Sequence, residues 1–221
     1  MRRLGLVASL ALGVTACGAE PTPTPAAACP TEPPTSVSAQ ATLEGATLAT
    51  VTVSGAVSGE FSIELYGDDA PIATANFAAL ARCGFYDGIK FHRVLAGFVI
   101  QAGDPGTKTQ DGDYPGIGRG GAGYEYPIEP PAPGLDYAQY TVAMANDTRT
   151  NDSQFFVTLV DLAGGLALDY TIFGQVTSGT DIVDAIAVVP VNDPSIGVPL
   201  APVSIDSIVI SSGSGPTPSG E

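Results

Sequence analysis

Short apolar-rich segments run through most of the chain, and glycine or proline interrupts them at short intervals. In residues 47–54 and 60–66 apolar and polar residues alternate. An alternation of period two is typical of a half-buried β-strand, because successive side chains point to opposite faces. With 27 glycines and 19 prolines in 221 residues, the chain suits a turn-rich β fold better than a helical bundle. We expect strands over residues 47–54, 60–66, 91–95, 98–102, 140–145, 154–159, 171–176 and 203–210.

Two stretches have helical character. The first opens at Asp69-Ala70-Pro71, with proline in its first turn, and stops at Gly84. The second covers residues 181–187 and is ended by Pro190. Many strands with two helices between them predict a mainly β protein, a closed barrel capped by two α-helices. This pattern alone does not choose among barrel types.

The N-terminal residues 1–16 are expected to be a signal peptide. Arg2 and Arg3 give a positive start, and the apolar run that follows is too short to span a bilayer, which needs roughly 20 residues. The run ends in Val14-Thr15-Ala16-Cys17, which is similar to the lipobox of bacterial lipoproteins, where the cysteine receives a diacylglycerol. An ordinary secretory signal with an incidental cysteine is the alternative. We expect lipidation of Cys17, because a Pro/Thr/Ala tract follows it.

Composition divides the rest of the chain into three parts. Residues 17–42 read as a lipid-anchored Pro/Thr/Ala-rich tether, 43–210 as one domain and 211–221 as a flexible tail. This organisation predicts an extracytoplasmic protein that is held to a bacterial membrane, the cell membrane or the outer membrane, only through its lipid.

Charge and residue counts exclude several function classes. A net charge of −15 argues against nucleic acid as a partner. One histidine, His92, and three cysteines leave no multi-histidine or Cys/His metal site, so we expect neither metal nor cofactor. If Cys17 is acylated, Cys29 and Cys83 remain in an oxidising compartment. They either pair or stay as two free thiols.

Four blocks of the domain carry the clearest motifs. They are FHRVLAGFVIQAGD at 91–104, AMAN at 143–146, TNDSQFF at 150–156 and YTIFGQV at 170–176. Together they resemble, in order, the signature segments of the cyclophilins, and the resemblance covers nearly all of residues 43–210. It implies an eight-stranded antiparallel barrel with a helix over each end and an active groove on the outer face. It also implies peptidyl-prolyl cis–trans isomerase activity without a cofactor.

The resemblance assigns roles to ten positions. It implies a catalytic group of Arg93, Phe98 and Gln101, and substrate-binding positions at Val99, Ala145, Asn146, Gln154, Phe156, Leu166 and Tyr170. Three positions depart from the family pattern. Gly165 stands where tryptophan is common, Tyr170 replaces a pocket histidine, and Asp152 replaces a glycine. The missing indole predicts weak binding of cyclosporin-type macrocycles.

The chemistry of such a site can be argued without the family. Rotation about a prolyl amide crosses a barrier of about 18–20 kcal/mol because it destroys amide resonance. No bond between heavy atoms is made or broken, so the reaction needs a donor aimed at the prolyl nitrogen and an apolar socket for the ring. A guanidinium such as that of Arg93 is a rigid, permanently charged donor. Phenylalanines such as Phe98 and Phe156 can supply the socket.

Taken singly, these residues have ordinary structural interpretations. Phe155 and Phe156 are adjacent on a strand, so only one of them can face a groove. By the same alternation His92 should point away from the side of Arg93, and we expect it to be structural, with a hydrogen-bond partner, and not a general base. The glycines of 116–121 fit G-x-G-x-x-G but lack the flanking strand and helix, so they predict a loop.

Three functions fit the sequence. The first is a monomeric isomerase that assists the folding of extracytoplasmic polypeptides at Xaa-Pro bonds. The second is a non-catalytic cyclophilin-like adaptor or holdase that binds proline-containing segments. The third is a solute-binding lipoprotein, which would normally be longer and two-lobed. The joint presence of Arg93, Phe98, Gln101 and Phe156 favours the first.

Overall fold

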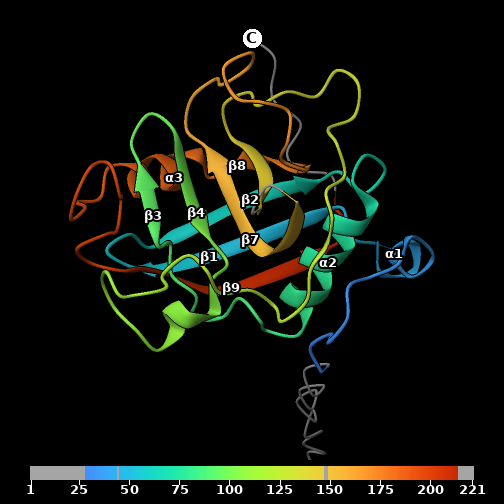
Figure 1. Cartoon of the computed structure of the whole chain (residues 1–221), viewed down its shortest axis with the longest axis horizontal. Helices are drawn as coiled ribbons and strands as arrows, with labels where there is room; N and C mark the ends of the chain where they lie inside the picture. The colour runs from blue at the N-terminus through green and yellow to red at the C-terminus, as the bar shows by residue number, and fades with distance from the viewer. Residues whose placement is uncertain (1–27, 44, 147–148, 214–221) are drawn as a thin grey trace, which may run out of the picture.

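A computed structural model of the chain describes residues 28–43, 45–146 and 149–213. All the strands of this part of the chain belong to a single curled antiparallel sheet (Figure 1). Its strands are β1 (Leu48–Gly55), β2 (Gly59–Leu65), β3 (Arg93–Leu95), β4 (Val99–Ala102), β5 (Tyr126–Pro127), β6 (Thr141–Asn146), β7 (Thr150–Thr158), β8 (Ile172–Ser178) and β9 (Val203–Ser211). Eight of them lie in the order β3-β4-β7-β6-β8-β2-β1-β9, and β5 pairs with the start of β7.

The two end strands of this order, β3 and β9, do not form a ladder with each other. Instead, the segment just before β3 closes the barrel, because the Phe91 amide donates to the Val203 carbonyl at 3.0 Å and the Ile205 amide donates to the Ile89 carbonyl at 2.8 Å. An isolated bridge pairs Lys90 with Ser204 between them. The predicted mainly β fold with eight antiparallel strands is confirmed, and its seam consists of a few hydrogen bonds.

The barrel interior is filled by the inward face of each strand. Phe77 packs at its centre, with ring centroids 5.4 Å from Phe155 and 5.0 Å from Phe173. It comes from helix α2 (Pro71–Arg82), and Val183 and Ile186 are the buried residues of helix α3 (Thr180–Ala187). Figure 1 shows these two helices at opposite ends of the barrel. They correspond to the two predicted helices.

A distant carboxylate holds the start of α2. Pro71 occupies the first turn as expected, but the preceding Ala70 has no side chain that can accept a hydrogen bond from the helix. Glu129 takes this role, since its two carboxylate oxygens accept from the amides of Ile72 at 3.0 Å and Ala73 at 2.8 Å. A negative charge at a helix N-terminus is favoured by both the unpaired amides and the helix dipole.

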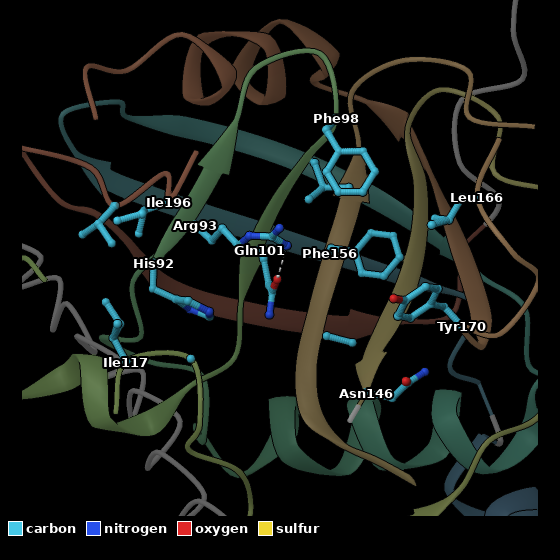
Figure 2. Close-up of a pocket in the computed structure, with 14 residues that line it drawn as sticks. His92, Arg93, Phe98, Gln101, Ile117, Asn146, Phe156, Leu166, Tyr170 and Ile196 are labelled. Atoms are coloured by element: carbon cyan, nitrogen blue, oxygen red, sulfur yellow. Dashed lines mark hydrogen bonds between the residues drawn. The ribbon is translucent and has the colours of Figure 1, made fainter. Parts of the chain in front are cut away.

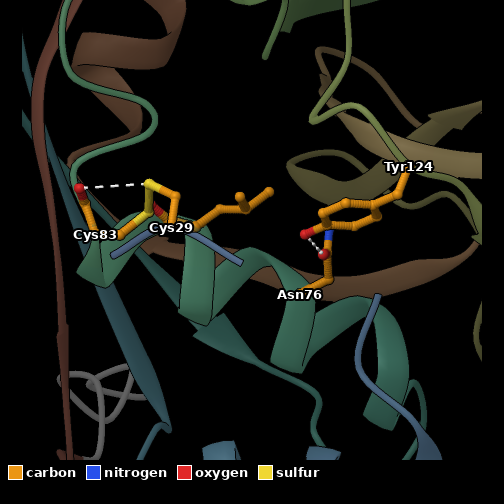
Figure 3. The surroundings of a disulfide bond; sticks show 5 residues. Cys29, Asn76, Cys83 and Tyr124 are labelled. Atoms are coloured by element: carbon orange, nitrogen blue, oxygen red, sulfur yellow. Dashed lines mark hydrogen bonds between the residues drawn. A yellow bond between two sulfur atoms is a disulfide. The ribbon is translucent and has the colours of Figure 1, made fainter. Parts of the chain in front are cut away.

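The N-terminal segment differs from the expected tether. A third helix, α1 (Ser36–Leu43), packs on α2, and the Arg82 guanidinium donates to the Thr42 carbonyl at 2.6 Å. A disulfide joins Cys29 to Cys83 at the end of α2, which is the first of the two states left open by the sequence (Figure 3). Residues 28–43 therefore lie on the folded body. Signal residues 1–16 and Cys17 lie outside the described residues, as does most of the predicted tail.

Helix length gives no sign of a membrane span in the part of the chain that the structure describes. No helix there is both long enough and apolar enough to cross a bilayer.

Candidate functional site

Three neighbouring strands place one row of side chains on the outer face of the barrel. Arg93 on β3 pairs with Gln101 on β4, and Gln101 pairs with Phe156 on β7. Residues directly opposite each other in a sheet share a face, so these three side chains point the same way. Phe155, one residue along β7, is fully buried in the barrel core. The alternation expected for this pair is confirmed, with Phe156 on the groove side.

A pocket of about 390 Å³ opens over this row. Figure 2 shows Arg93 and Gln101 at its centre, with Phe156, Leu166 and Tyr170 on one side. The structure brings together all but one of the positions assigned from the sequence: Arg93, Phe98, Val99, Gln101, Ala145, Asn146, Phe156, Leu166 and Tyr170 line this pocket. Gln154 lines an adjoining pocket of about 370 Å³, which also contacts Gln101 and Asn146.

One half of the pocket is an apolar socket. Phe156 lies edge-on to Tyr170, with their ring centroids 5.4 Å apart. Tyr170 is fixed from behind by Tyr137, whose hydroxyl donates to the Tyr170 carbonyl at 2.9 Å and accepts from its amide at 3.0 Å. Phe98 and Leu166 complete the wall. The socket has the apolar character that the methylene groups of a small saturated ring require.

A chain of amides orients the guanidinium. The Arg93 Nη1 donates to the Gln101 Oε1 at 3.3 Å, and the Gln101 Nε2 donates to the Gln154 Oε1 at 2.9 Å. Gln154 is fixed in turn, because its Nε2 donates to the carbonyls of Gly118 at 3.0 Å and Gly120 at 2.8 Å. Within the described ranges no carboxylate pairs with Arg93. Its charge is therefore aimed at the pocket without a neutralising partner.

The glycine-rich segment 116–121 is a loop, as predicted, and its position depends on a buried carboxylate. The Asp104 Oδ2 accepts from the Gly118 amide at 2.7 Å, while its Oδ1 accepts from the Gly106 amide at 2.8 Å. A Cβ at Gly120 would lie 2.0 Å from the Asp104 Oδ1, so only glycine fits beside that carboxylate. The loop supplies the carbonyls that hold Gln154.

His92 departs from its expected place. It lines the pocket beside Arg93, and neither of its buried ring nitrogens meets the geometry of a hydrogen bond to any described residue. The expected partner is therefore not found at normal hydrogen-bond geometry, although the Lys90 backbone acts on the ring as a hydrogen-bonding group. Burial lowers the pKa of His92 to about 4, and Arg93 adds to this effect, while Asp104 and the Lys90 backbone oppose it. The ring is neutral at physiological pH.

Sequence reasoning missed the wall of the pocket beyond Arg93. Ile117, Ile196 and Val198 lie there with His92. Ile117 and Ile196 belong to irregular segments rich in glycine and proline, so no strand or helix period placed them. The described residues contain no cluster of three or more His, Cys, Asp or Glu side chains that could hold a metal ion.

Comparison with known proteins gives one consistent result. The sequence model described as cyclophilin type peptidyl-prolyl cis-trans isomerase/CLD matches residues 48–210. The probable peptidyl-prolyl cis-trans isomerase A of Mycobacterium leprae is 39% identical over 174 residues, covering 69% of this chain and 87% of that protein. Peptidyl-prolyl cis-trans isomerase B of Streptomyces anulatus is 40% identical over 171 residues, covering 69% of this chain and 91% of that protein.

A solved structure gives the same result. The crystal structure of a cyclophilin type peptidyl-prolyl cis-trans isomerase of Cryptosporidium parvum matches with a TM-score of 0.64 and 30% sequence identity. The match covers 76% of this chain and 99% of that chain.

Proposed function

The chain belongs to the cyclophilin-type peptidyl-prolyl cis–trans isomerases and is an enzyme of that type, and on that premise we propose that it isomerises Xaa-Pro bonds of extracytoplasmic polypeptides from a lipid anchor and so assists their folding. Family membership favours the isomerase over a non-catalytic adaptor. Its substrates are proline-containing polypeptides. A single barrel carries the whole groove, so a monomer suffices for catalysis.

The observation that carries the catalytic assignment is the Arg93–Gln101–Gln154 chain beside the aromatic socket. As the prolyl amide twists, the lone pair on its nitrogen becomes localised and can accept a hydrogen bond. Arg93 donates to that nitrogen only in the twisted state, so its contribution belongs to the transition state. Gln101 holds the guanidinium in place beforehand, which limits the reorganisation needed during the reaction.

The other residues of the pocket hold the proline ring or bind the substrate backbone. Phe98, Phe156 and Leu166 hold the ring while the acyl side of the bond rotates. Ala145 and Asn146 lie on the rim and bind the substrate backbone, with Val99 and Tyr170 in the wall behind the ring. No nucleophile, metal or cofactor takes part, because no heavy-atom bond changes.

Substitution of Arg93 tests this mechanism. Arg93→Ala is expected to lower kcat/KM for a proline tetrapeptide by about 10- to 150-fold, the value of a hydrogen bond from a charged group. Arg93→Lys should recover little, because an ammonium does not reproduce the planar guanidinium. Arg82→Ala removes an arginine outside the groove and should leave kcat/KM unchanged. Full activity in a folded Arg93→Ala variant would assign the donor role to another residue.

Two features support the proposed location. The Val14-Thr15-Ala16-Cys17 sequence ends an apolar run, and Cys29 and Cys83 form a disulfide, a bond that persists in oxidising compartments. One acyl chain anchors only marginally, so we infer a multiply acylated Cys17. Cys17→Ala should give an unprocessed or soluble protein on membrane fractionation. Recovery of this variant in membranes at its normal processed size would rule out the anchor.

A further inference from the structure

Gln154 is the fixed end of the amide chain that orients Arg93, so the support of Gln154 matters to the guanidinium. Its side chain is held by two carbonyls of the glycine-rich loop 116–121. Its main chain belongs to β7, but the ladders between β7 and its neighbouring described strands skip residues 152–154. A buried backbone amide in such a gap needs an acceptor from outside the ladder.

Asp152 supplies that acceptor. Its Oδ1 accepts from the Gln154 amide at 2.7 Å, and an ionised acceptor makes a stronger hydrogen bond than a neutral one. The other carboxylate oxygen lies against the glycine-rich loop, because a Cβ at Gly121 would be 2.5 Å from the Asp152 Oδ2. The carboxylate therefore fills the space between β7 and the loop, the two elements that hold Gln154.

Helix α2 fixes the main chain of Asp152 from a third side. The side chain of Asn76, which is fully buried, donates from its Nδ2 to the Asp152 carbonyl at 3.0 Å. Its Oδ1 accepts at 2.7 Å from the hydroxyl of Tyr124, which follows the loop (Figure 3). Burial raises the pKa of Tyr124 to about 12, so the hydroxyl keeps the proton that it donates. Strand, loop and helix are therefore joined at Asp152.

We propose that Asp152 is a positioning residue for the isomerisation, which acts through Gln154 to keep the Arg93 guanidinium aimed at the prolyl nitrogen. This inference rests on the proposed function. Among the described residues, Asp152 lines only the adjoining pocket and not the one around Arg93, so its effect on the reaction is indirect. Asp152 stands where the family pattern has glycine, and glycine has no side-chain acceptor. The support is therefore a feature of this sequence.

The test compares Asp152→Ala with Asp152→Asn, and NMR exchange of a proline tetrapeptide gives kcat and KM separately. Asp152→Ala should lower kcat by about 3- to 10-fold and change KM by less than about twofold, because a misaligned donor weakens the twisted state and not substrate binding. The loss should not exceed that of Arg93→Ala. Asp152→Asn keeps an acceptor oxygen and should hold kcat within about twofold of wild type.

A double-mutant cycle with Gln154→Ala separates positioning from a general structural role. If Asp152 acts through Gln154, Asp152→Ala should lower kcat by less than about twofold in the Gln154→Ala background, whereas a purely structural role would give the same loss in both backgrounds. Asp206→Ala is the control, because it removes a carboxylate that accepts from the Ser54 hydroxyl at 2.6 Å outside the pocket lining. Its kcat should equal that of wild type. Thermal melting verifies that each variant is folded, and Asp152→Gly, which also lacks an acceptor, replaces Asp152→Ala if the latter does not fold.

The outcomes separate the positioning role from the proposed function. Wild-type kcat in Asp152→Ala overturns the role, as does an equal loss in both backgrounds or an Asp152→Asn variant as slow as Asp152→Ala. Absence of exchange catalysis by the wild type overturns the proposed function instead. In that event the side-chain amide NMR signals of Gln101 and Gln154 decide the role: Asp152→Ala should shift both, and unchanged signals would overturn it.

Discussion

An uncharged imidazole beside a guanidinium keeps the positive charge of the groove on one residue. His92 is about 5% exposed and lies next to Arg93 in the sequence and in the pocket. Its lowered pKa of about 4 leaves it neutral across the physiological range, while arginine does not titrate there. We therefore expect kcat/KM to be nearly flat between about pH 6 and 8. A rate that fell with a midpoint in this range would mean that the ring of His92 does titrate.

His92 also links stability to pH. Its pKa is about 4 in the folded state and 6.5 in the unfolded state, so the unfolded chain binds more protons between these values. The free energy of unfolding therefore falls as the pH is lowered through this window, by about 3 kcal/mol from this residue alone. In His92→Gln this contribution should vanish. Urea denaturation at pH 7 and pH 4.5 measures the difference.

The control for this measurement is the comparison between the two proteins at each pH. Protonation of other groups in acid also changes the free energy of unfolding, but it does so in both proteins, so only the difference in slope reports on His92. Equal slopes for wild type and His92→Gln would show that the ring is hydrated in solution. The two proteins should also have similar kcat/KM at pH 7, because a neutral His92 is not the donor to the prolyl nitrogen.

At the scale of single elements, helix α2 depends on a residue far from it in sequence. Glu129 accepts from the amides of Ile72 and Ala73, and its own amide donates to the Thr171 hydroxyl at 2.9 Å. Glu129→Ala should lower the free energy of unfolding by about 1–2 kcal/mol, the range of a lost cap with its dipole interaction. Glu129→Gln keeps one acceptor oxygen and should lose less. Denaturation in urea, with hydrogen exchange at the amides of Ile72 and Ala73, provides the measurement.

An unchanged exchange rate at both amides in Glu129→Ala would contradict the cap. The sequence did not predict this contact, because Glu129 precedes a proline pair and belongs to no periodic segment. Caps at adjacent positions can be read from local residues, whereas a cap contributed from 57 residues away depends on the folded barrel.

The eight main strands, in contrast, could be predicted from local sequence, because each is a short apolar-rich segment bounded by turn residues, and β1 and β2 also alternate between buried and more exposed positions. The row of Arg93, Gln101 and Phe156 was predicted from the resemblance to the cyclophilin segments, and the sheet register then places the three residues opposite one another on one face. Three features were not accessible. Strand β5 has only two residues, helix α1 falls in a segment whose composition indicates a tether, and Ile196 reaches the groove through a hairpin docked on β3. All three depend on contacts between segments distant in sequence.

At the scale of the whole molecule, the disulfide sets how far the barrel can lie from its proposed anchor. Cys29 is about 12 residues from Cys17, a span of at most about 40 Å when fully extended. Without the disulfide the first firm attachment to the barrel would be β1, which begins at Leu48, so the reach would more than double. The Arg82 contact to Thr42 helps to hold α1 but is a single hydrogen bond.

This gives a prediction for Cys29→Ser/Cys83→Ser. The disulfide closes a loop across 54 residues, so its loss should lower the free energy of unfolding by about 2–4 kcal/mol. Residues 28–43 should become sensitive to limited proteolysis, because α1 then depends on weak contacts. The kcat/KM for a proline tetrapeptide should stay within about twofold, since neither cysteine lines the groove. Wild type treated with dithiothreitol should match the double variant. If α1 resists proteolysis equally in untreated wild type, reduced wild type and the double variant, its packing on α2 suffices without the disulfide.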